Sequence, residues 1–327
     1  MKKTLLAFTI LNTFTGVALA QTSVMIYGIV DNAITRYDDG NNVITGLTSG
    51  RQSSSRIGFK GTEDLGNGLK AVFTLESGIN TDDGSATAGF NRQANVGLQG
   101  GFGTVAVGVN NSSMKRVIDK LDAFGNGGLN GLAGIYGTNE RLSNSIHYVT
   151  PGFGGFSGAI TYGFGEVAGS SSANRKINFS ASYAARQLGV HFAYDHQNGP
   201  TIARAGDKTK TAVLGASYDF GVTKLFASYL QRRTDGAAAA KVNGFNIGAS
   251  VKLGVGSILA SVSRLKNDVN PADKFNLYGV GYVYPMSKRT NLYATYGLAS
   301  NDGGSRVWSA RNGENGSRLA LGIKHAF

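Results

Sequence analysis

The sequence has no cysteine, only four prolines and one tryptophan among 327 residues, and no run approaching 18 consecutive apolar residues. The absence of cysteine excludes disulfides, so a secreted form of the chain must be stabilised in another way. The absence of a long apolar run excludes a membrane-spanning helix. Such a chain can still cross a bilayer as a closed β-barrel, in which every strand is paired and the sheet has no edge.

The first twenty residues have the pattern of a secretory signal peptide. Lys2 and Lys3 form a charged start, and a short apolar region covers residues 5–11. Ala18 and Ala20 stand at the two positions where a signal peptidase requires small residues. We therefore expect a cleaved signal peptide at 1–20 and a mature chain at 21–327. A buried N-terminal strand is the alternative for this segment.

Glycine and aromatic residues, by contrast, are abundant, and the chain is basic. Its 48 glycines, 14 tyrosines and 17 phenylalanines suit tight turns, close strand packing and the aromatic girdles of membrane barrels. The formal net charge of +12 becomes +10 once the two lysines of the signal peptide are removed. A basic chain can bind nucleic acid, an anionic membrane surface or small anions, and export argues against nucleic acid as a partner.

From Gln21 onward the chain repeats one unit, a segment of alternating polarity followed by a turn or loop. The pattern predicts an all-β protein, a transmembrane antiparallel β-barrel of sixteen strands, an even number as in other bacterial barrels. The sixteen candidate strands cover residues 22–36, 50–62, 69–79, 91–100, 103–109, 141–150, 155–164, 175–185, 188–196, 208–220, 222–232, 241–253, 256–266, 274–284, 290–299 and 317–327.

The connections between these strands alternate in length. Short turns rich in Gly, Asn and Asp fall near 64–68, 100–103, 151–155, 221, 254–256 and 285–288. Longer loops fall near 37–49, 80–90, 110–140, 165–174, 197–207, 233–240, 267–273 and 300–316. Short turns at one rim and long loops at the other are typical of outer-membrane barrels. A soluble β-sandwich also alternates in polarity, but its connections are less regularly asymmetric.

The last strand indicates which face of the wall meets lipid. Because the Cβ direction alternates along a strand, its side chains divide into two sets. The apolar set is Leu319, Leu321, Ile323 and Phe327; the opposite set is Arg318, Ala320, Gly322, Lys324 and Ala326. An apolar face outside and charge inside is the inverse of a soluble barrel, and it indicates a wet lumen surrounded by lipid.

Segments spread over the whole mature chain resemble the general porins of the Gram-negative outer membrane. Together they resemble the beta-proteobacterial branch, whose members include anion-selective porins. The turn at 61–66 (GTEDLG) and the terminal 325–327 (HAF) are the most specific. The matching segments are 24–31 (VMIYGIVD), 55–71 (SRIGFKGTEDLGNGLKA), 102–105 (FGTV), 148–151 (YVTP), 153–156 (FGGF), 214–218 (LGASY) and 321–327 (LGIKHAF).

This resemblance implies a homotrimer of sixteen-stranded barrels embedded in outer-membrane lipid and lipopolysaccharide. It implies that a third loop, here about 110–140, folds inward and narrows the pore. It also implies that the terminal Phe327 is read by the outer-membrane assembly machinery. In this branch three arginines crowd the constriction, and they correspond to Arg56, Arg92 and Arg141 of this sequence.

Strand alternation supports two of these arginines independently of the resemblance. Arg56 shares its face with Lys60, and Arg141 shares its face with the polar residues 143, 145 and 147. Strict alternation puts Arg92 on the lipid side. Either a β-bulge or the end of the preceding loop must therefore turn Arg92 inward.

Arginine is suited to an anion filter because its guanidinium stays charged and presents several fixed donors to a partly dehydrated anion. Around a narrow, water-filled aperture such groups concentrate anions and repel cations. Four further basic residues lie on the lumen side by their parity and are expected to extend this basic track: Lys60, Lys70, Arg318 and Lys324. Glu76, Asp119 and Asp122 are expected to balance the field and to hold the inward loop. Each of these charges could instead be a solvated residue of the wall.

The sequence offers little for catalysis or for binding a metal. There is no cysteine, and among the four histidines His191 and His196 lie on opposite faces of one strand. The Asp-Asp-Gly stretches at 38–40 and 82–84 could hold Ca²⁺, although Asp-Gly is equally common in turns. We expect no enzymatic activity, no metal and no cofactor.

These observations predict a passive channel for small hydrophilic solutes and ions that favours anions. The alternative is a channel specific for anionic nutrients such as phosphate or organic acids, whose conductance would saturate with one solute. A barrel enzyme or adhesin is a third possibility, and the sequence contains neither a catalytic constellation nor an extra surface domain to favour it.

Overall fold

The computed structural model describes residues 23–125, 131–138, 140–236 and 239–327, so the expected signal peptide at 1–20 lies outside the described residues. The strands are β1 (Ser23–Asp38), β2 (Val43–Ser49), β3 (Arg56–Gly66), β4 (Leu69–Gly78), β5 (Gln93–Gly100), β6 (Gly103–Asn111), β7 (Arg141–Val149), β8 (Phe156–Gly163), β9 (Lys176–Ala185), β10 (Leu188–Asn198), β11 (Lys208–Asp219), β12 (Thr223–Thr234), β13 (Ala240–Leu253), β14 (Gly256–Asn267), β15 (Lys274–Pro285), β16 (Thr290–Asp302) and β17 (Gly316–Ala326). The helices are α1 (Ser113–Leu121), α2 (Leu132–Tyr136) and the 3-10 helix η2 (Ile202–Arg204).

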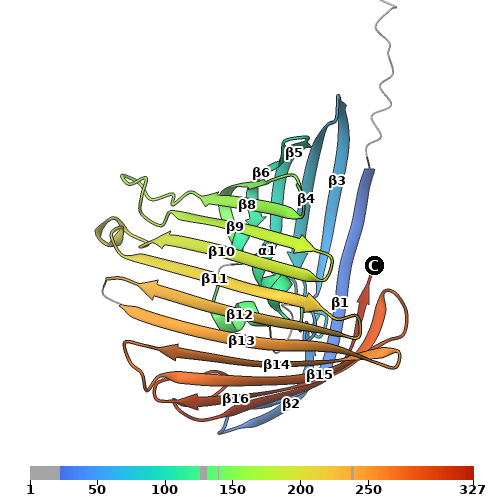
Figure 1. Cartoon of the computed structure of the whole chain (residues 1–327), viewed down its shortest axis with the longest axis vertical. Helices are drawn as coiled ribbons and strands as arrows, with labels where there is room; N and C mark the ends of the chain where they lie inside the picture. The colour runs from blue at the N-terminus through green and yellow to red at the C-terminus, as the bar shows by residue number, and fades with distance from the viewer. Residues whose placement is uncertain (1–22, 126–130, 139, 237–238) are drawn as a thin grey trace, which may run out of the picture.

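All of these strands belong to one antiparallel sheet, which closes on itself where β1 pairs with β17 (Figure 1). Two strands share a single position in the wall: β3 pairs with residues 23–29 of β1, and β2 pairs with residues 32–38. The wall is therefore a closed barrel with sixteen strand positions, which confirms the fold expected from the sequence.

One expected loop is wrong. The sequence pattern predicts a long loop at 37–49, but strand β2 occupies most of it and only residues 39–42 form the turn. The side chain of Asp39 closes this turn, because its Oδ1 accepts hydrogen bonds from the backbone nitrogens of Asn41 (2.9 Å) and Asn42 (2.6 Å). The wall is interrupted instead at 50–55, where the sequence predicts the start of a strand. Few large apolar residues alternate in either segment, so polarity gave no signal for pairing there.

The interruption at 50–55 is tied to the wall by Asp31, which is fully buried on β1. One oxygen of its carboxylate accepts hydrogen bonds from the backbone nitrogens of Gln52 (2.7 Å) and Ser53 (2.5 Å). The other accepts a hydrogen bond from the hydroxyl of Tyr293 on β16 (2.5 Å). These contacts determine where the chain re-enters the wall at Arg56, the first residue of β3.

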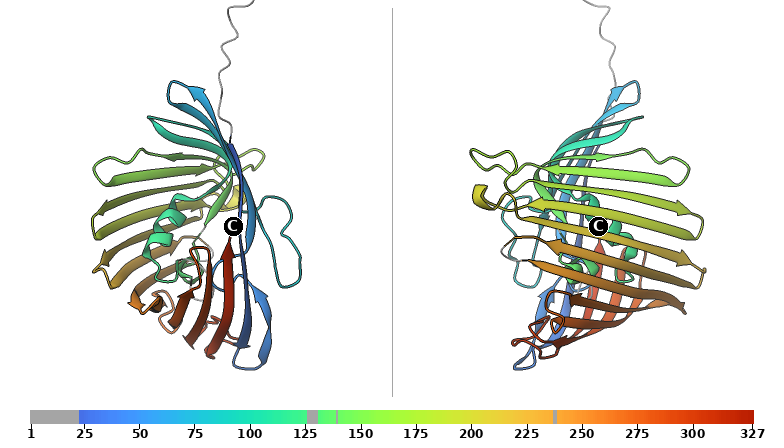
Figure 2. Two further views of the ribbon diagram at one scale, coloured as in Figure 1. Left: turned by 90° about the vertical axis from the view of Figure 1, so that its right-hand side faces the viewer. Right: turned by 60° about the vertical axis from the view of Figure 1, so that its left-hand side comes forward.

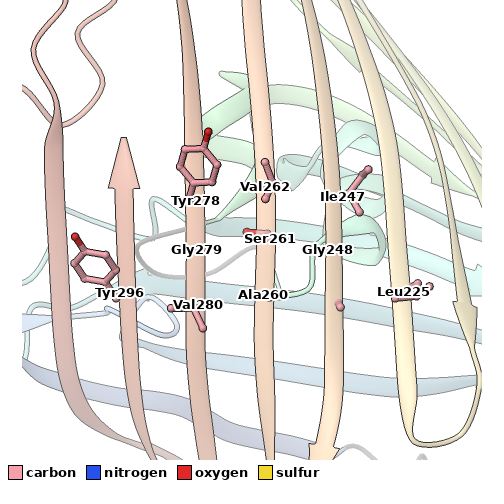
Figure 3. Close-up of a pocket in the computed structure, with 11 residues that line it drawn as sticks. Leu225, Ile247, Gly248, Ala260, Ser261, Val262, Tyr278, Gly279, Val280 and Tyr296 are labelled. Carbon is pink, nitrogen blue, oxygen red and sulfur yellow. The ribbon is translucent and has the colours of Figure 1, made fainter. Parts of the chain in front are cut away.

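The outward face of the wall is apolar and exposed. On β17, Leu321 is 52% exposed, whereas its inward neighbour Ala320 is fully buried. Across β12 to β16 this face carries aliphatic and tyrosine side chains, with a hollow of about 340 Å³ beside Ala260, whose small side chain lies on the same face as Val262 (Figure 3). Soluble proteins rarely expose an apolar surface of this extent, and a lipid-facing barrel requires it.

The connection between β6 and β7 carries α1 and α2 and packs against the inner face of the wall (Figure 2). Ser112 caps α1 by accepting a hydrogen bond from the backbone nitrogen of Lys115 (3.0 Å), and the next residue, Ser113, donates its own backbone N–H to the side chain of Asn178 on β9 (2.8 Å). The buried side chains that hold α1 and α2 to the wall are Met114, Val117, Ile118, Leu121, Leu132 and Tyr136 from the connection, and Ala193, Val213, Leu230 and Leu265 from the strands. This is the long connection expected to fold inward.

Tyr136 of α2 contacts the wall of the barrel through its hydroxyl group. Burial raises the pKa of Tyr136, so its hydroxyl stays protonated beside Ser228 of β12, at an oxygen–oxygen distance of 2.9 Å.

Within the described ranges, no helix has the length and apolar character needed to cross a membrane.

We predict that Asp31→Ala destabilises the barrel by about 1–3 kcal/mol, because it leaves two backbone N–H groups without their buried acceptor. The free energy of unfolding in urea, measured on protein folded in detergent, tests this. Asp31→Asn, which keeps one acceptor oxygen, should lose less. Asp38→Ala on the same strand is the control and should lose little; equal losses for Asp31→Ala and Asp38→Ala would contradict the role given to Asp31.

Candidate functional site

Charged side chains from several parts of the barrel meet at one cavity of about 480 Å³ in the lumen. All three arginines predicted from the sequence line it, together with two of the three predicted acids. The charged residues that line the cavity are Arg56, Glu76, Arg92, Lys115, Asp119, Glu140 and Arg141.

Arg92 reaches the lumen because it precedes its strand rather than belonging to it. β5 begins at Gln93, so Arg92 is the last residue of the preceding connection and escapes the alternation of the strand. Its Nε lies 2.6 Å from Oε1 of Glu76, with both side chains about nine-tenths buried. The hydroxyl of Tyr27 donates to the other oxygen of Glu76 (2.9 Å). Glu76 thus holds Arg92 and Tyr27 in fixed positions.

Arg56 is the first residue of β3 and faces the same cavity. In the described part of the chain it forms no ion pair, and its guanidinium donates a hydrogen bond to the hydroxyl of Ser53 (3.4 Å). The positive charges of Arg92 and Arg141 and the negative charge of Glu76 all act on it. The guanidinium of Arg56 therefore stands in a basic environment in which Glu76 is already engaged by Arg92.

Arg141 opens β7 and is tied only loosely to an acid. Its Nη1 lies 3.8 Å from the carboxylate of Glu140, and its Nε has no hydrogen-bond partner among the described residues. Lys115 of α1 lies 2.8 Å from Asp119 and 3.4 Å from Glu140. The contact with Glu140 anchors the start of α1 beside the first residue of β7, whereas the contact with Asp119 lies within α1.

Two predicted site residues lie outside this cavity. Lys60 is exposed on the inward face of β3, with its Nζ 5.2 Å from the centroid of the Tyr27 ring. Asp122 ends α1, where it is buried and accepts hydrogen bonds from the backbone nitrogens of Phe124 (2.8 Å) and Leu132 (2.7 Å). Asp122 therefore fixes the fold of the inward connection through these two hydrogen bonds.

The sequence reasoning missed several polar residues of this region. Glu140 precedes Arg141 directly, a signal that could have been used, whereas Lys115 enters the cavity only because α1 packs inward. Arg116 and Lys120 add further positive charge on the same helix. Burial lowers the pKa of Arg116. Burial, and to a smaller extent the positive charge of Arg116, lowers the pKa of Lys120.

Phe327 closes the wall rather than lying free at its end. Its backbone nitrogen and oxygen each form a hydrogen bond of 3.1 Å with Gly28 of β1. Its ring covers Gly28, since a Cβ atom at that position would lie 2.4 Å from the ring. Gly28 is thus the position where the terminal ring needs the space that only glycine leaves.

The residues considered as calcium ligands have other contacts. Asp39 accepts backbone hydrogen bonds within its turn, which hold the pKa of its carboxyl below the ordinary value. Asp83 likewise accepts a hydrogen bond from the backbone nitrogen of Ser85 (2.8 Å). No group of three or more metal-ligating side chains occurs in the ranges that the structure describes.

Comparison with known proteins agrees with this geometry. Residues 5–304 match the family described as Gram-negative porin. The chain belongs to this family. An outer membrane porin protein 32 from Delftia acidovorans is 34% identical over the full length of both chains, and an outer membrane porin from Bordetella pertussis is 32% identical, also over both full lengths.

Two solved porin structures superimpose on this chain. An anion-selective porin from Comamonas acidovorans superimposes with a TM-score of 0.84 at 30% identity, covering 94% of this chain and 100% of that one. OmpT of Vibrio cholerae in its trimer form superimposes with a TM-score of 0.73, covering 94% and 99%. At 15% identity, the second likeness concerns the fold alone. The protein is thus an outer-membrane porin of the multi-pass β-barrel type.

We predict opposite shifts in ion preference from Glu76→Gln and Arg92→Gln. Both variants break the same ion pair, so both should lose about 1–3 kcal/mol of stability. Glu76→Gln removes a negative charge from the cavity and should move the zero-current potential in a KCl gradient toward chloride. Arg92→Gln should move the potential toward potassium. Shifts of the same sign in the two variants would mean that altered geometry, rather than charge, sets the preference.

Proposed function

We propose that this porin is a water-filled channel for small hydrophilic solutes and ions, in which Arg56, Arg92 and Arg141 give preference to anions. The observation that supports this most directly is that the three guanidinium groups line one cavity while Arg56 forms no ion pair in the described ranges. A guanidinium that no carboxylate neutralises can share its donors with a passing anion. The relative from Comamonas acidovorans, described as anion-selective, supports the same direction.

The surplus positive charge lies on two of the three arginines. Arg92 is paired closely with Glu76, and Lys115 is paired with Asp119 and Glu140. Arg56 and Arg141 remain to supply most of the field in the cavity, with Lys60 beside Tyr27 as a further charge toward the β3–β4 turn. Two weakly engaged guanidiniums attract anions without the tight binding that would slow their release.

We predict that Arg56→Ser combined with Arg141→Ser moves the ion preference toward cations. The zero-current potential of purified protein in a planar bilayer under a KCl gradient measures it. Arg36→Ser combined with Arg264→Ser is the matched control, because it removes the same charge from strand positions exposed on the outward face. A double variant whose potential equals that of the wild type would remove the arginines from the filter.

A general channel and a solute-specific channel differ in how conductance depends on concentration. We propose the general type, so that chloride, phosphate and small organic acids each give currents that rise with concentration. Saturation with one of these anions alone would establish the specific type instead. We also infer that the protein has no catalytic activity, since Glu76 and Asp119 are engaged in ion pairs; a hydrolytic assay on the purified protein should stay blank.

We further infer that the mature chain, after loss of residues 1–20, assembles as a homotrimer among outer-membrane lipid and lipopolysaccharide. The trimer form of OmpT supports the oligomeric state, and the exposed apolar outward face supports the lipid contact. Conductance steps that arrive in threes are the expected signature of such an assembly.

Phe327 is proposed as the residue through which the assembly machinery recognises the chain. We predict that Phe327→Ala lowers the yield of assembled protein in the outer membrane, because the ring that the machinery would recognise is lost. The backbone pairing with Gly28 remains in this variant. Deleting Phe327 should lower it further. The control is refolding of Phe327→Ala into detergent without the machinery, which should give channels of wild-type conductance. Normal yield in cells would show that the signal is read elsewhere.

A further inference from the structure

A second basic cavity lies in the lumen, distinct from the one that holds Arg56, Arg92 and Arg141. Its volume is about 430 Å³, and none of the residues that line it lines the first cavity. It is formed where β1, β2 and β17 approach the rim that carries the loop between β16 and β17. The lining residues that matter below are Tyr37, Ile44, Thr48, Arg51 and Arg318.

The charge in this second cavity is not neutralised. In the described ranges neither Arg51 nor Arg318 forms an ion pair. Arg51 donates from its Nε to the hydroxyl of Thr48 (3.0 Å), and the buried Nε of Arg318 has no hydrogen-bond partner there. Arg51 and Arg318 line the same cavity, and no carboxylate of the described residues lines it with them. Two guanidiniums kept together without an acid form a site for an anion.

Aromatic rings hold Arg318 in place and leave its charge intact. The central carbon of its guanidinium lies 4.8 Å from the ring centroid of Tyr37 and 4.6 Å from that of Trp308. The loop bearing Trp308 is fixed by Asn301, whose side chain donates to the backbone oxygen of Val307 (2.9 Å) and accepts from its nitrogen (2.9 Å). Cation–π contacts orient a guanidinium while leaving its edge donors available.

An apolar surface adjoins these charges. Ile44 of β2 lies directly opposite Tyr37 of β1, on the same face, and is 59% exposed. An exposed isoleucine beside a half-buried tyrosine ring is unusual on the inward face of a barrel, where polar side chains dominate. The cavity therefore combines a pair of anion-binding donors with a place for an apolar group.

We propose that this cavity is a binding site for small organic carboxylates that bear an apolar or aromatic body. The carboxylate accepts hydrogen bonds from Arg51 and Arg318, and the body lies against Ile44 and Tyr37. The site rests on the proposed anion channel, because it lies between the rim that carries the β16–β17 loop and the cavity that holds Arg56. Binding there raises the local concentration of such solutes before they reach Arg56.

Benzoate is the probe that tests this site, with acetate as the carboxylate that lacks the ring. Each is added to both sides of a planar bilayer, and the concentration that halves the chloride current is measured. In wild-type protein, benzoate should act at a concentration about tenfold lower than acetate, because only benzoate covers Ile44 and Tyr37. Combining Arg51→Gln with Arg318→Gln should raise the benzoate concentration about tenfold.

Arg36→Gln is the matched control, since Arg36 lies next to Tyr37 on β1 but is exposed on the opposite face. It should leave the half-blocking concentration of benzoate unchanged. If the double variant does not assemble, Arg51→Gln alone, which keeps the stacked Arg318, should raise it about threefold. Equal block of wild type and the Arg51 variants, or equal weakening by Arg36→Gln, overturns the site.

The zero-current potential of wild-type protein in KCl alone separates this inference from the proposed function. Cation preference there contradicts the anion channel itself. Chloride preference together with benzoate block that ignores Arg51 and Arg318 leaves the channel standing and removes only the second site.

Discussion

Closure of the sheet is the constraint on which the rest of this structure depends. Hydrocarbon offers no hydrogen-bond partner, so every backbone group in the wall has to be satisfied by a neighbouring strand. β1 meets this requirement by pairing with β17 along one edge. Along its other edge it pairs first with β3 and then with β2. Phe327 completes the ring by pairing its backbone with Gly28, where the absence of a side chain leaves space for the terminal ring.

The interruption of the wall between β2 and β3 has a chemical consequence. It permits six residues, 50–55, to leave the ladder, and Asp31 returns the chain to the wall at Arg56. One buried carboxylate thus positions the segment that places Arg51 in the second cavity and ends beside Arg56 in the first. Stability of the wall and the geometry of the charged lumen are therefore coupled through Asp31.

Paired and unpaired charges divide the work in the lumen. Glu76 fixes Arg92, and Asp119 and Glu140 fix Lys115, so these close pairs hold the inward connection and the strand ends in register. Arg56 in one cavity and Arg318 in the other are held without a carboxylate, by position in a strand and by ring contacts respectively. A channel needs both, because fixed geometry without surplus charge attracts nothing, and surplus charge without fixed geometry has no defined aperture.

The sequence alone determined what depends on local alternation. A period of two residues predicts that the side chains of Arg56 and Lys60 point inward and that Leu321 points outward. The same period, counted along the chain, predicts the sixteen positions in the wall, and it is a property of each strand by itself. Tertiary structure decided what depends on distant partners. Pairing and packing between separate segments of the chain produce four features: strand β2, the inward position of Arg92, the contacts of Asp122, and the shared cavity of Arg51 and Arg318. A local pattern carries no record of such contacts, because the residues that make them are neighbours only after the barrel closes.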